Sequence, residues 1–210
     1  MIKKDSDGKA YAFDASGSSR LSDTPVTSGF TIYGGGKNKP AKENVTIDIQ
    51  NVQVSRIYGG GFSDGTGTAD LSGNVSIKVS GTVNASTVYG GGYANAYKGN
   101  ASANVSGSVT VDIPSVPSGN HGNLYGGGYA TSTGTGKASA DVSGPVSCTM
   151  KSVDIREVYS GGDASNHACA DVAGSITANL TNCSSIYGYV TAGATASSGG
   201  SADVNGSVGQ

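Results

Sequence analysis

The chain has 210 residues, the size of one domain or of one stretch of a repeat array. Glycine supplies 35 of the 210 residues, or about one in six, and charged residues supply only 13%. A typical soluble domain has about 7% glycine and about 25% charged residues. Five prolines and no glycine at every third position exclude a collagen triple helix. A net charge of −2 with 36% apolar residues argues against disorder, and no basic cluster favours a nucleic-acid partner.

The first 28 residues precede any repeat. The alternating segment Ala10–Phe13 predicts a strand in an irregular first coil, or in a cap over the end of the repeat array. The opening segment Met1–Gly8 lacks the apolar core of a signal peptide, and no apolar stretch approaches the about 18 residues of a membrane-spanning helix. We expect the chain to be a piece of a longer protein whose repeats continue beyond Gln210, so the missing signal carries little weight.

A short sequence motif, an aliphatic residue followed by Tyr-Gly-Gly-Gly, recurs from residue 29 onward, and we call it the tyrosine word. The four complete tyrosine words are Ile32–Gly36, Ile57–Gly61, Val88–Gly92 and Leu124–Gly128, and two altered copies are Val158–Gly162 and Ile186–Tyr189. From Tyr33 to Tyr187 the tyrosines follow each other at a mean spacing of about 31 residues, within the range of solenoid repeats.

Between the tyrosine words, apolar and polar residues alternate strictly. The run is clearest over residues 101–113, and its period of two is typical of β-strands. Each run is interrupted by one glycine on its apolar side. These glycines are Gly73, Gly107, Gly144 and Gly174. A missing side chain where the core should be filled indicates a bend, so we predict a corner at each of them.

The tyrosine word and the alternating run together predict an all-β parallel solenoid over residues 29–210, with about six coils of about 31 residues. No segment shows the 3.6-residue period of a helix. An antiparallel sandwich would not require the same words in every unit, and units of 25 and 28 residues are cramped for a four-stranded propeller blade. The residues expected to line one core are Val105, Val109, Val111, Val142, Val146, Val172 and Ile176.

At the level of whole repeats, the tyrosine word followed by Ala-[Asp/Asn]-Val-x-Gly-x-Val resembles the repeats of adhesin-like surface proteins of bacteria. These are right-handed parallel β-helix proteins, often large secreted proteins of anaerobic gut species. The resemblance covers residues 29–210 and implies a right-handed coil at the cell surface or outside the cell. It also implies a non-enzymatic scaffold or adhesin without a cofactor. Because β-helices include pectate-lyase-like polysaccharide enzymes, a carbohydrate-active lyase or hydrolase is the alternative.

Two rows of aromatic residues are the candidate binding site, for a glycan or a protein of a host or cell surface. If the aliphatic residue of each tyrosine word points inward, the tyrosine points outward, and a second aromatic residue four positions later shares its face. The predicted site residues are Tyr58, Phe62, Tyr89, Tyr93, Tyr125 and Tyr129. Exposed stripes flanking a bare glycine strip would suit stacking against sugar rings. The alternatives are tyrosines that only stabilise their own ladder, and inward tyrosines with the glycines forming a tight corner.

Four aspartates and one asparagine form a second row, called the acidic row, one position before a strand aliphatic. This row consists of Asp70, Asn104, Asp141, Asp171 and Asp203. The simplest interpretation is a solvated polar position copied with the repeat; calcium bridging or catalysis is the alternative. His167, Cys169 and Asp171 also alternate onto one face and offer three metal-ligand types, although a solvated surface is the simpler interpretation. We predict no catalytic residue and no metal, and we expect Cys148 to be a buried hydrophobe.

Overall fold

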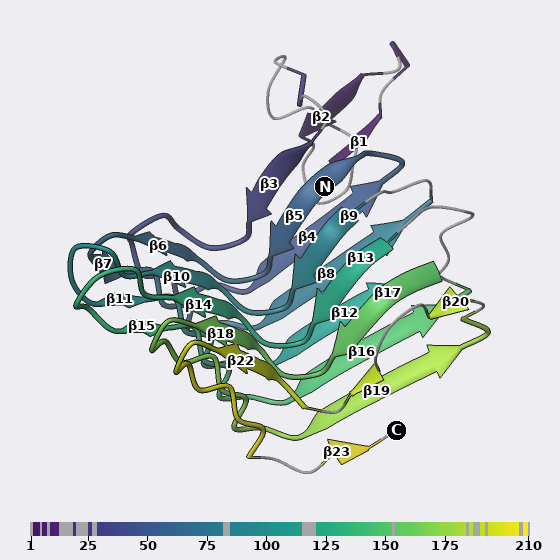
Figure 1. Ribbon diagram of the computed structural model, residues 1–210. Helices are drawn as coiled ribbons and strands as arrows, with labels where there is room; N and C mark the ends of the chain where they lie inside the picture. The colour runs from purple at the N-terminus through teal and green to yellow at the C-terminus, as the bar shows by residue number, and fades with distance from the viewer. Residues whose placement is uncertain are drawn as a thin grey trace.

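The computed structural model describes residues 2–4, 6–7, 9–12, 19, 25–26, 29–81, 85–114, 121–152, 154–183, 185–186, 190–191, 193–205 and 208–209. Within these ranges the chain forms strands and turns and no helix. Successive coils stack along one axis, so that each strand pairs with its counterpart in the next coil (Figure 1). All strand pairs from β3 onward are parallel, which confirms the predicted parallel β-solenoid.

Four sheets run along the described part of the solenoid. The long sheet contains, in spatial order, β2 (Ala10–Ala12), β1 (Ile2–Lys4), β4 (Val45–Gln50), β8 (Val75–Ser80), β12 (Val109–Ile113), β16 (Val146–Lys151), β19 (Ile176–Thr181) and β23 (Val208–Gly209). The tyrosine sheet contains β20 (Ser185–Ile186), β17 (Asp154–Tyr159), β13 (His121–Tyr125), β9 (Ala85–Tyr89), β5 (Val54–Tyr58) and β3 (Phe30–Tyr33), and β21 (Val190–Thr191) also pairs with β17.

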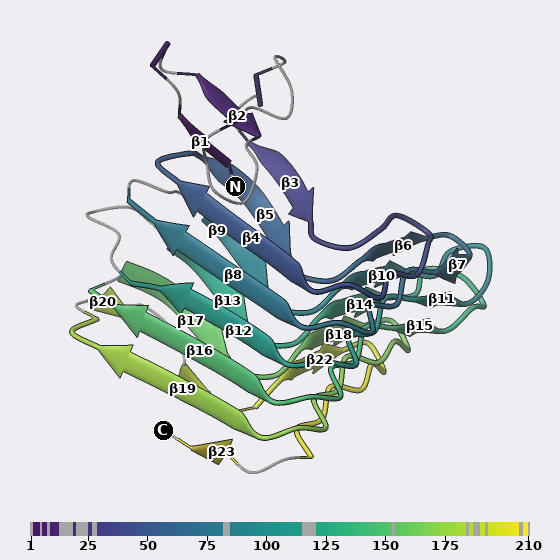
Figure 2. The ribbon, with the colours of Figure 1, turned by 180° about the vertical axis from the view of Figure 1, so that it is seen from behind.

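The other two sheets are shorter and form an arm that projects to one side, as both views show (Figures 1 and 2). The arm sheet contains β22 (Thr195–Ser197), β18 (Asp163–Ser165), β14 (Tyr129–Thr131), β10 (Tyr93–Asn95) and β6 (Phe62–Asp64). The tip sheet contains β15 (Ala138–Ser139), β11 (Ala101–Ser102) and β7 (Gly67–Thr68).

The number of coils differs from the prediction of six. The structure has about 4 turns of ~32 residues. The difference arises at the two ends of the repeat. The word at Tyr33 precedes the first turn that has a strand in all four sheets, which begins with β4, and the word at Ile186–Tyr189 lies largely outside the described residues.

The core has two compartments, which follow from the residue sizes in the alternating runs. Between the long sheet and the tyrosine sheet, the buried side chains are mostly valine, isoleucine and leucine. In the arm they are alanines, such as Ala94, Ala103 and Ala140, so the arm and tip sheets approach closely. All seven predicted core residues are at most 1% exposed, which confirms that prediction. Cys148 is fully buried beside them, also as expected.

The predicted corners are present. The chain bends at Gly73, Gly107, Gly144 and Gly174, between an isolated bridge and the following strand of the long sheet. At Gly107 an added Cβ would lie 2.4 Å from the carbonyl oxygen of Gly73 in the preceding turn, so the bend leaves no room for a side chain. A second turn follows the long sheet, where Asn51, Gly81 and Asn182 have positive φ. Asn and Gly adopt that left-handed conformation most readily.

The N-terminal hairpin of β1 and β2 extends the long sheet, because Ile2 pairs in parallel with Ile49. Much of residues 1–28 lies outside the described residues, so the expectation of a cap stays a prediction. No helix in the described part of the chain is long and apolar enough to cross a membrane.

Candidate functional site

The tyrosines of the repeated words form one continuous ladder on the outer face of the tyrosine sheet. The tyrosine ladder consists of Tyr33, Tyr58, Tyr89, Tyr125 and Tyr159. Parallel in-register pairing places each ring directly above the preceding one. The centroids of adjacent rings are 4.7 to 5.2 Å apart, and the planes of Tyr58 and Tyr89 differ by only 2°. In β5 the neighbouring Ile57 lies in the core, which confirms that the tyrosines point away from it.

The arm sheet contributes a second row that packs against this ladder. The arm row consists, in register, of Phe62, Tyr93, Tyr129, Asp163 and Thr195. Each of its rings contacts the ladder ring of the preceding turn: Tyr58 stacks on Tyr93 with centroids 5.2 Å apart, and Tyr89 contacts Tyr129 at 5.4 Å. The two predicted stripes therefore meet in the angle between the sheets and cover one another, and we call the rings of both rows together the aromatic cluster.

This packing corrects the expectation of two exposed stripes. Tyr58, Tyr89 and Tyr125 are only 3%, 7% and 6% exposed, and Tyr93 and Tyr129 are half-buried. The faces of the rings also stack against each other, so they are not free for a sugar ring to stack on. What remains accessible to a ligand is the half-buried rings of the arm row, Tyr93 and Tyr129. Whether a glycan or a protein binds there stays a prediction.

The glycines of each word form a tight corner, not a bare strip for a ligand. A Cβ added to Gly59 would lie 2.4 Å from Cγ1 of Val75, in the valine core. One added to Gly61 would lie 2.8 Å from Cβ of Ala69, in the alanine core. The word needs glycine because its backbone passes between the two core compartments with no space for a side chain.

Burial changes the acid–base behaviour of the ladder. Desolvation raises the pKa of Tyr93 to about 12, and it raises the pKa of Tyr58 and Tyr89 further. Asp163, the carboxylate of the arm row, lies close to Tyr89 and adds to the rise of that pKa. Burial also raises the pKa of Asp163, while hydrogen bonds from Thr195 and Tyr89 partly oppose the rise. These phenols are therefore neutral at physiological pH.

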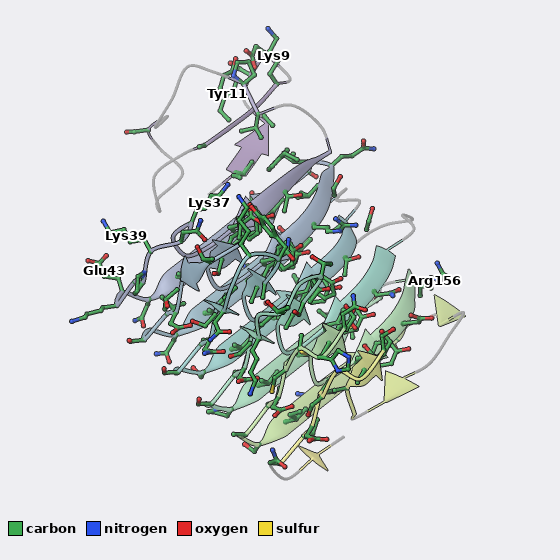
Figure 3. The ribbon with its side chains drawn as sticks, turned by 60° about the vertical axis from the view of Figure 1, so that its left-hand side comes forward. Lys9, Tyr11, Lys37, Lys39, Glu43 and Arg156 are labelled. Carbon is green, nitrogen blue, oxygen red and sulfur yellow. The ribbon has the colours of Figure 1, made fainter. Side chains whose placement is uncertain are left out.

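Charged side chains stand at the two ends of the aromatic part of the arm row, Phe62 to Tyr129. Lys37, labelled in Figure 3, lies at the N-terminal end, with its Nζ 5.1 Å from the centroid of the Phe62 ring. At the other end, Asp163 Oδ2 accepts a hydrogen bond of 3.4 Å from the hydroxyl of Tyr89, and Oδ1 accepts one of 2.9 Å from Thr195. The carboxylate thus reaches into the aromatic cluster from the position that a tyrosine occupies one turn earlier.

The acidic row forms a hydrogen-bonded ladder along the tip of the arm. In each turn, the side-chain Oδ1 accepts the backbone N–H of the equivalent residue in the next turn. These bonds run from Asn104 to Asp70, from Asp141 to Asn104, from Asp171 to Asp141 and from Asp203 to Asp171, at 2.7 to 2.8 Å. Serine hydroxyls, such as that of Ser102, add bonds to the same carboxylates. The row therefore joins neighbouring turns in a structural role.

One group within the described residues could hold a metal ion, and it differs from the trio His167, Cys169 and Asp171, which the sequence offered as an alternative to a solvated surface. Cys169 and Asp171 come together with Asp141, and their ligand atoms all lie within 4.8 Å of one another. His167 is not part of this group; it has a positive φ and lies against Gly199 in a turn. A thiolate with two carboxylates suits zinc better than calcium, which takes oxygen ligands. Both carboxylates already belong to the structural ladder.

Cys169 should react slowly with alkylating agents. Its Sγ lies 3.2 Å from Asp141 Oδ1 and 3.0 Å from Asp171 Oδ2, and burial together with these carboxylates raises the pKa of the thiol. Because the thiolate is the nucleophile, we expect slower modification by iodoacetamide at neutral pH than for a free thiol, and an increase as the pH rises. Replacing both Asp141 and Asp171 by Asn should lower the pKa and speed the reaction. Mass spectrometry of modified peptides gives the rates, and equal rates with and without the carboxylates would contradict the assignment.

Comparison with protein-family models, with curated proteins and with solved structures gives no match. The fold itself places the chain in the class of parallel β-solenoid repeat proteins.

Two features of the site escaped sequence reasoning. The first is the role of Asp163 and Lys37, which lie in register with the aromatic residues of the arm row. Asp163 follows an altered tyrosine word, and Lys37 stands where the second aromatic residue of a complete word would be. Aligning the repeats by their glycines would have placed both in that row. The second is the pairing of Cys169 with Asp141, 28 residues earlier. Only the stacking of adjacent turns brings these two together.

Proposed function

We propose that the chain is a non-enzymatic segment of a secreted bacterial surface protein and acts as an extended scaffold or adhesin. The observation that carries the proposal is that the repeated polar and aromatic side chains bond and pack against neighbouring turns of the solenoid. The carboxylates of the acidic row bond the backbone of the next turn, and the tyrosines pack on each other. Groups that hold the turns together in this way support a structural role.

The alternative, a polysaccharide lyase or hydrolase, needs unlike polar groups that converge in one turn. In the described part of the chain, the repeat departs from its pattern at Asp163, where the arm row has Tyr129, and at Cys169, where the row in register has Ser102 and Ser139. The raised pKa of that thiol does not favour a nucleophile. We therefore keep the scaffold or adhesin as the leading function.

An adhesin would recognise its partner with the ring edges and hydroxyls of the aromatic cluster and the polar groups beside them. Asn123 belongs to this surface, with its Nδ2 2.8 Å from Glu157 Oε2 and 3.4 Å from the hydroxyl of Tyr125. Side chains that both donate and accept hydrogen bonds suit the hydroxyl groups of a glycan. A protein partner at a host or cell surface would use the same groups.

The two functions differ in turnover. The purified chain would be incubated with a panel of pectic and host glycans, with detection of new reducing or unsaturated ends, and probed in parallel on a glycan array. We expect no turnover at any pH. Turnover that disappears in the Asp171→Asn variant, while the variant melts at an unchanged temperature, would contradict the scaffold and favour the enzyme. Binding to one glycan class without turnover would support an adhesin.

A further inference from the structure

We propose that Tyr89 and Tyr125 are a site of oxidative dityrosine cross-linking, with Asp163 as the acceptor of the phenolic proton of Tyr89. The ring centroids of this pair are 4.7 Å apart, the shortest spacing within the tyrosine ladder, and their planes differ by 11°. The strands are parallel and in register at these residues, so the same edges of the two rings lie above one another. Because the two rings are already held together, their coupling does not require two phenols to meet by diffusion.

Removal of an electron from a tyrosine requires a base, because the oxidised phenol must release its proton. Tyr89 donates its hydroxyl hydrogen to Asp163 Oδ2 at 3.4 Å. The carboxylate has a second anchor in Thr195, which bonds its other oxygen at 2.9 Å. Asp163 is therefore held where it can take the proton of Tyr89 as the electron leaves.

The electron has a short route to the surface. Tyr89 contacts the ring of Tyr129 at a centroid distance of 5.4 Å, and Tyr129 is half-buried at the rim of the aromatic cluster. A one-electron oxidant that touches Tyr129 can thus oxidise Tyr89 without entering the ladder. Tyr125 is next to Tyr89 and is oxidised in the same way, and its hydroxyl, which accepts a hydrogen bond from Asn123, releases its proton to the solvent.

The reaction balances as follows for the two side chains. Each phenol loses one electron and one proton and becomes a phenoxyl radical. The radicals form one carbon–carbon bond between their ortho carbons, and the two ortho hydrogens move to the oxygens and restore both rings. The net loss is two electrons and two protons, which a terminal oxidant such as persulfate or hydrogen peroxide takes up. The bond would join two adjacent turns through residues 36 positions apart in the sequence and would oppose their separation.

The test uses the whole chain, photo-oxidised with a ruthenium tris-bipyridyl complex and persulfate in visible light. All variants carry Tyr97→Phe, because among the described residues Tyr97 is the aromatic side chain that is well exposed, at 41%, and it would couple between molecules. The monomer would be isolated in denaturant and digested with trypsin. We expect the segments 79–98 and 99–137 to be joined with the loss of two hydrogen atoms, and fragmentation to place the bond between Tyr89 and Tyr125.

Three further variants separate this site from other routes. Tyr89→Phe keeps the ring in the ladder and should lower the yield of the joined segments at least roughly tenfold. Asp163→Asn keeps the shape of the side chain but not its basicity, and should slow the coupling at least roughly tenfold, since a positioned base typically contributes about 10²–10⁴-fold. Tyr33→Phe removes a ladder phenol outside the pair and should change nothing.

The proposal is wrong if the joined segments are linked through Tyr93 and Tyr129, whose rings are 5.2 Å apart, or if cross-links form only between molecules. It is also wrong if Tyr89→Phe couples as well as the parent while it melts at the same temperature. An unchanged rate in Asp163→Asn would remove the proton acceptor from the proposal.

Discussion

Replacing Val109 by Asp should destabilise the solenoid by about 3–5 kcal/mol, the usual cost of a buried charge without a partner. Val109 is fully buried, pairs in register with Val75 and Val146, and lies directly under the glycine corner at Gly90. No cation lies in this valine core among the described residues. The melting temperature should fall by about 2–4 °C for each kcal/mol lost in a chain of this length.

The matched control is Thr110→Asp, one residue further along the same strand. Thr110 is exposed on the outer face of the long sheet, so the same charge stays in water there, and its effect should be within about 0.5 kcal/mol. Calorimetry gives both melting temperatures, and hydrogen exchange shows whether the neighbouring turns open with the mutated one. Equal melting temperatures for the two variants would contradict the assignment of Val109 to a dry core.

Replacing Tyr89 and Tyr93 together by Ala should cost about 3–5 kcal/mol or more, because removing a buried aromatic side chain leaves a cavity. Tyr89 stacks on Tyr58 at 4.9 Å and on Tyr125 at 4.7 Å, and Tyr93 stacks on Tyr58 from the arm. The double variant therefore breaks the ladder in the middle turn. We expect a clear fall in the melting temperature, since each aromatic contact contributes about 0.5–1.5 kcal/mol beyond the buried area.

Two controls give this result its meaning. Tyr89→Phe keeps every ring contact and loses only the hydrogen bond to Asp163, so it should cost about 1 kcal/mol. Tyr97→Ala removes an exposed ring and should be nearly neutral. If the double variant keeps the melting temperature of the parent but no longer binds a glycan to which the parent binds, the tyrosines are a binding surface and not a structural ladder.

Sequence by itself determined the repeat, the strand period and the side of each strand that faces the core. Alternation of Ala103, Val105 and Val109 with polar residues leaves one orientation that buries the aliphatic side chains, and this local rule needs no partner. The corner at Gly107 follows from the same pattern, because a glycine on the apolar side of a strand leaves a gap in the core unless the chain bends there.

Tertiary structure alone decided what the outward residues do. Tyr89 and Asp141 both point away from the core, as the alternation predicts, yet neither is free on a flat surface. The angle between the tyrosine sheet and the arm sheet brings Tyr93 against Tyr58, and the stacking of turns brings Asp141 against the backbone of Asp171. Such contacts depend on the path of the chain between strands and on the register of neighbouring turns. The period of two is the same whether an outward ring meets solvent or another ring.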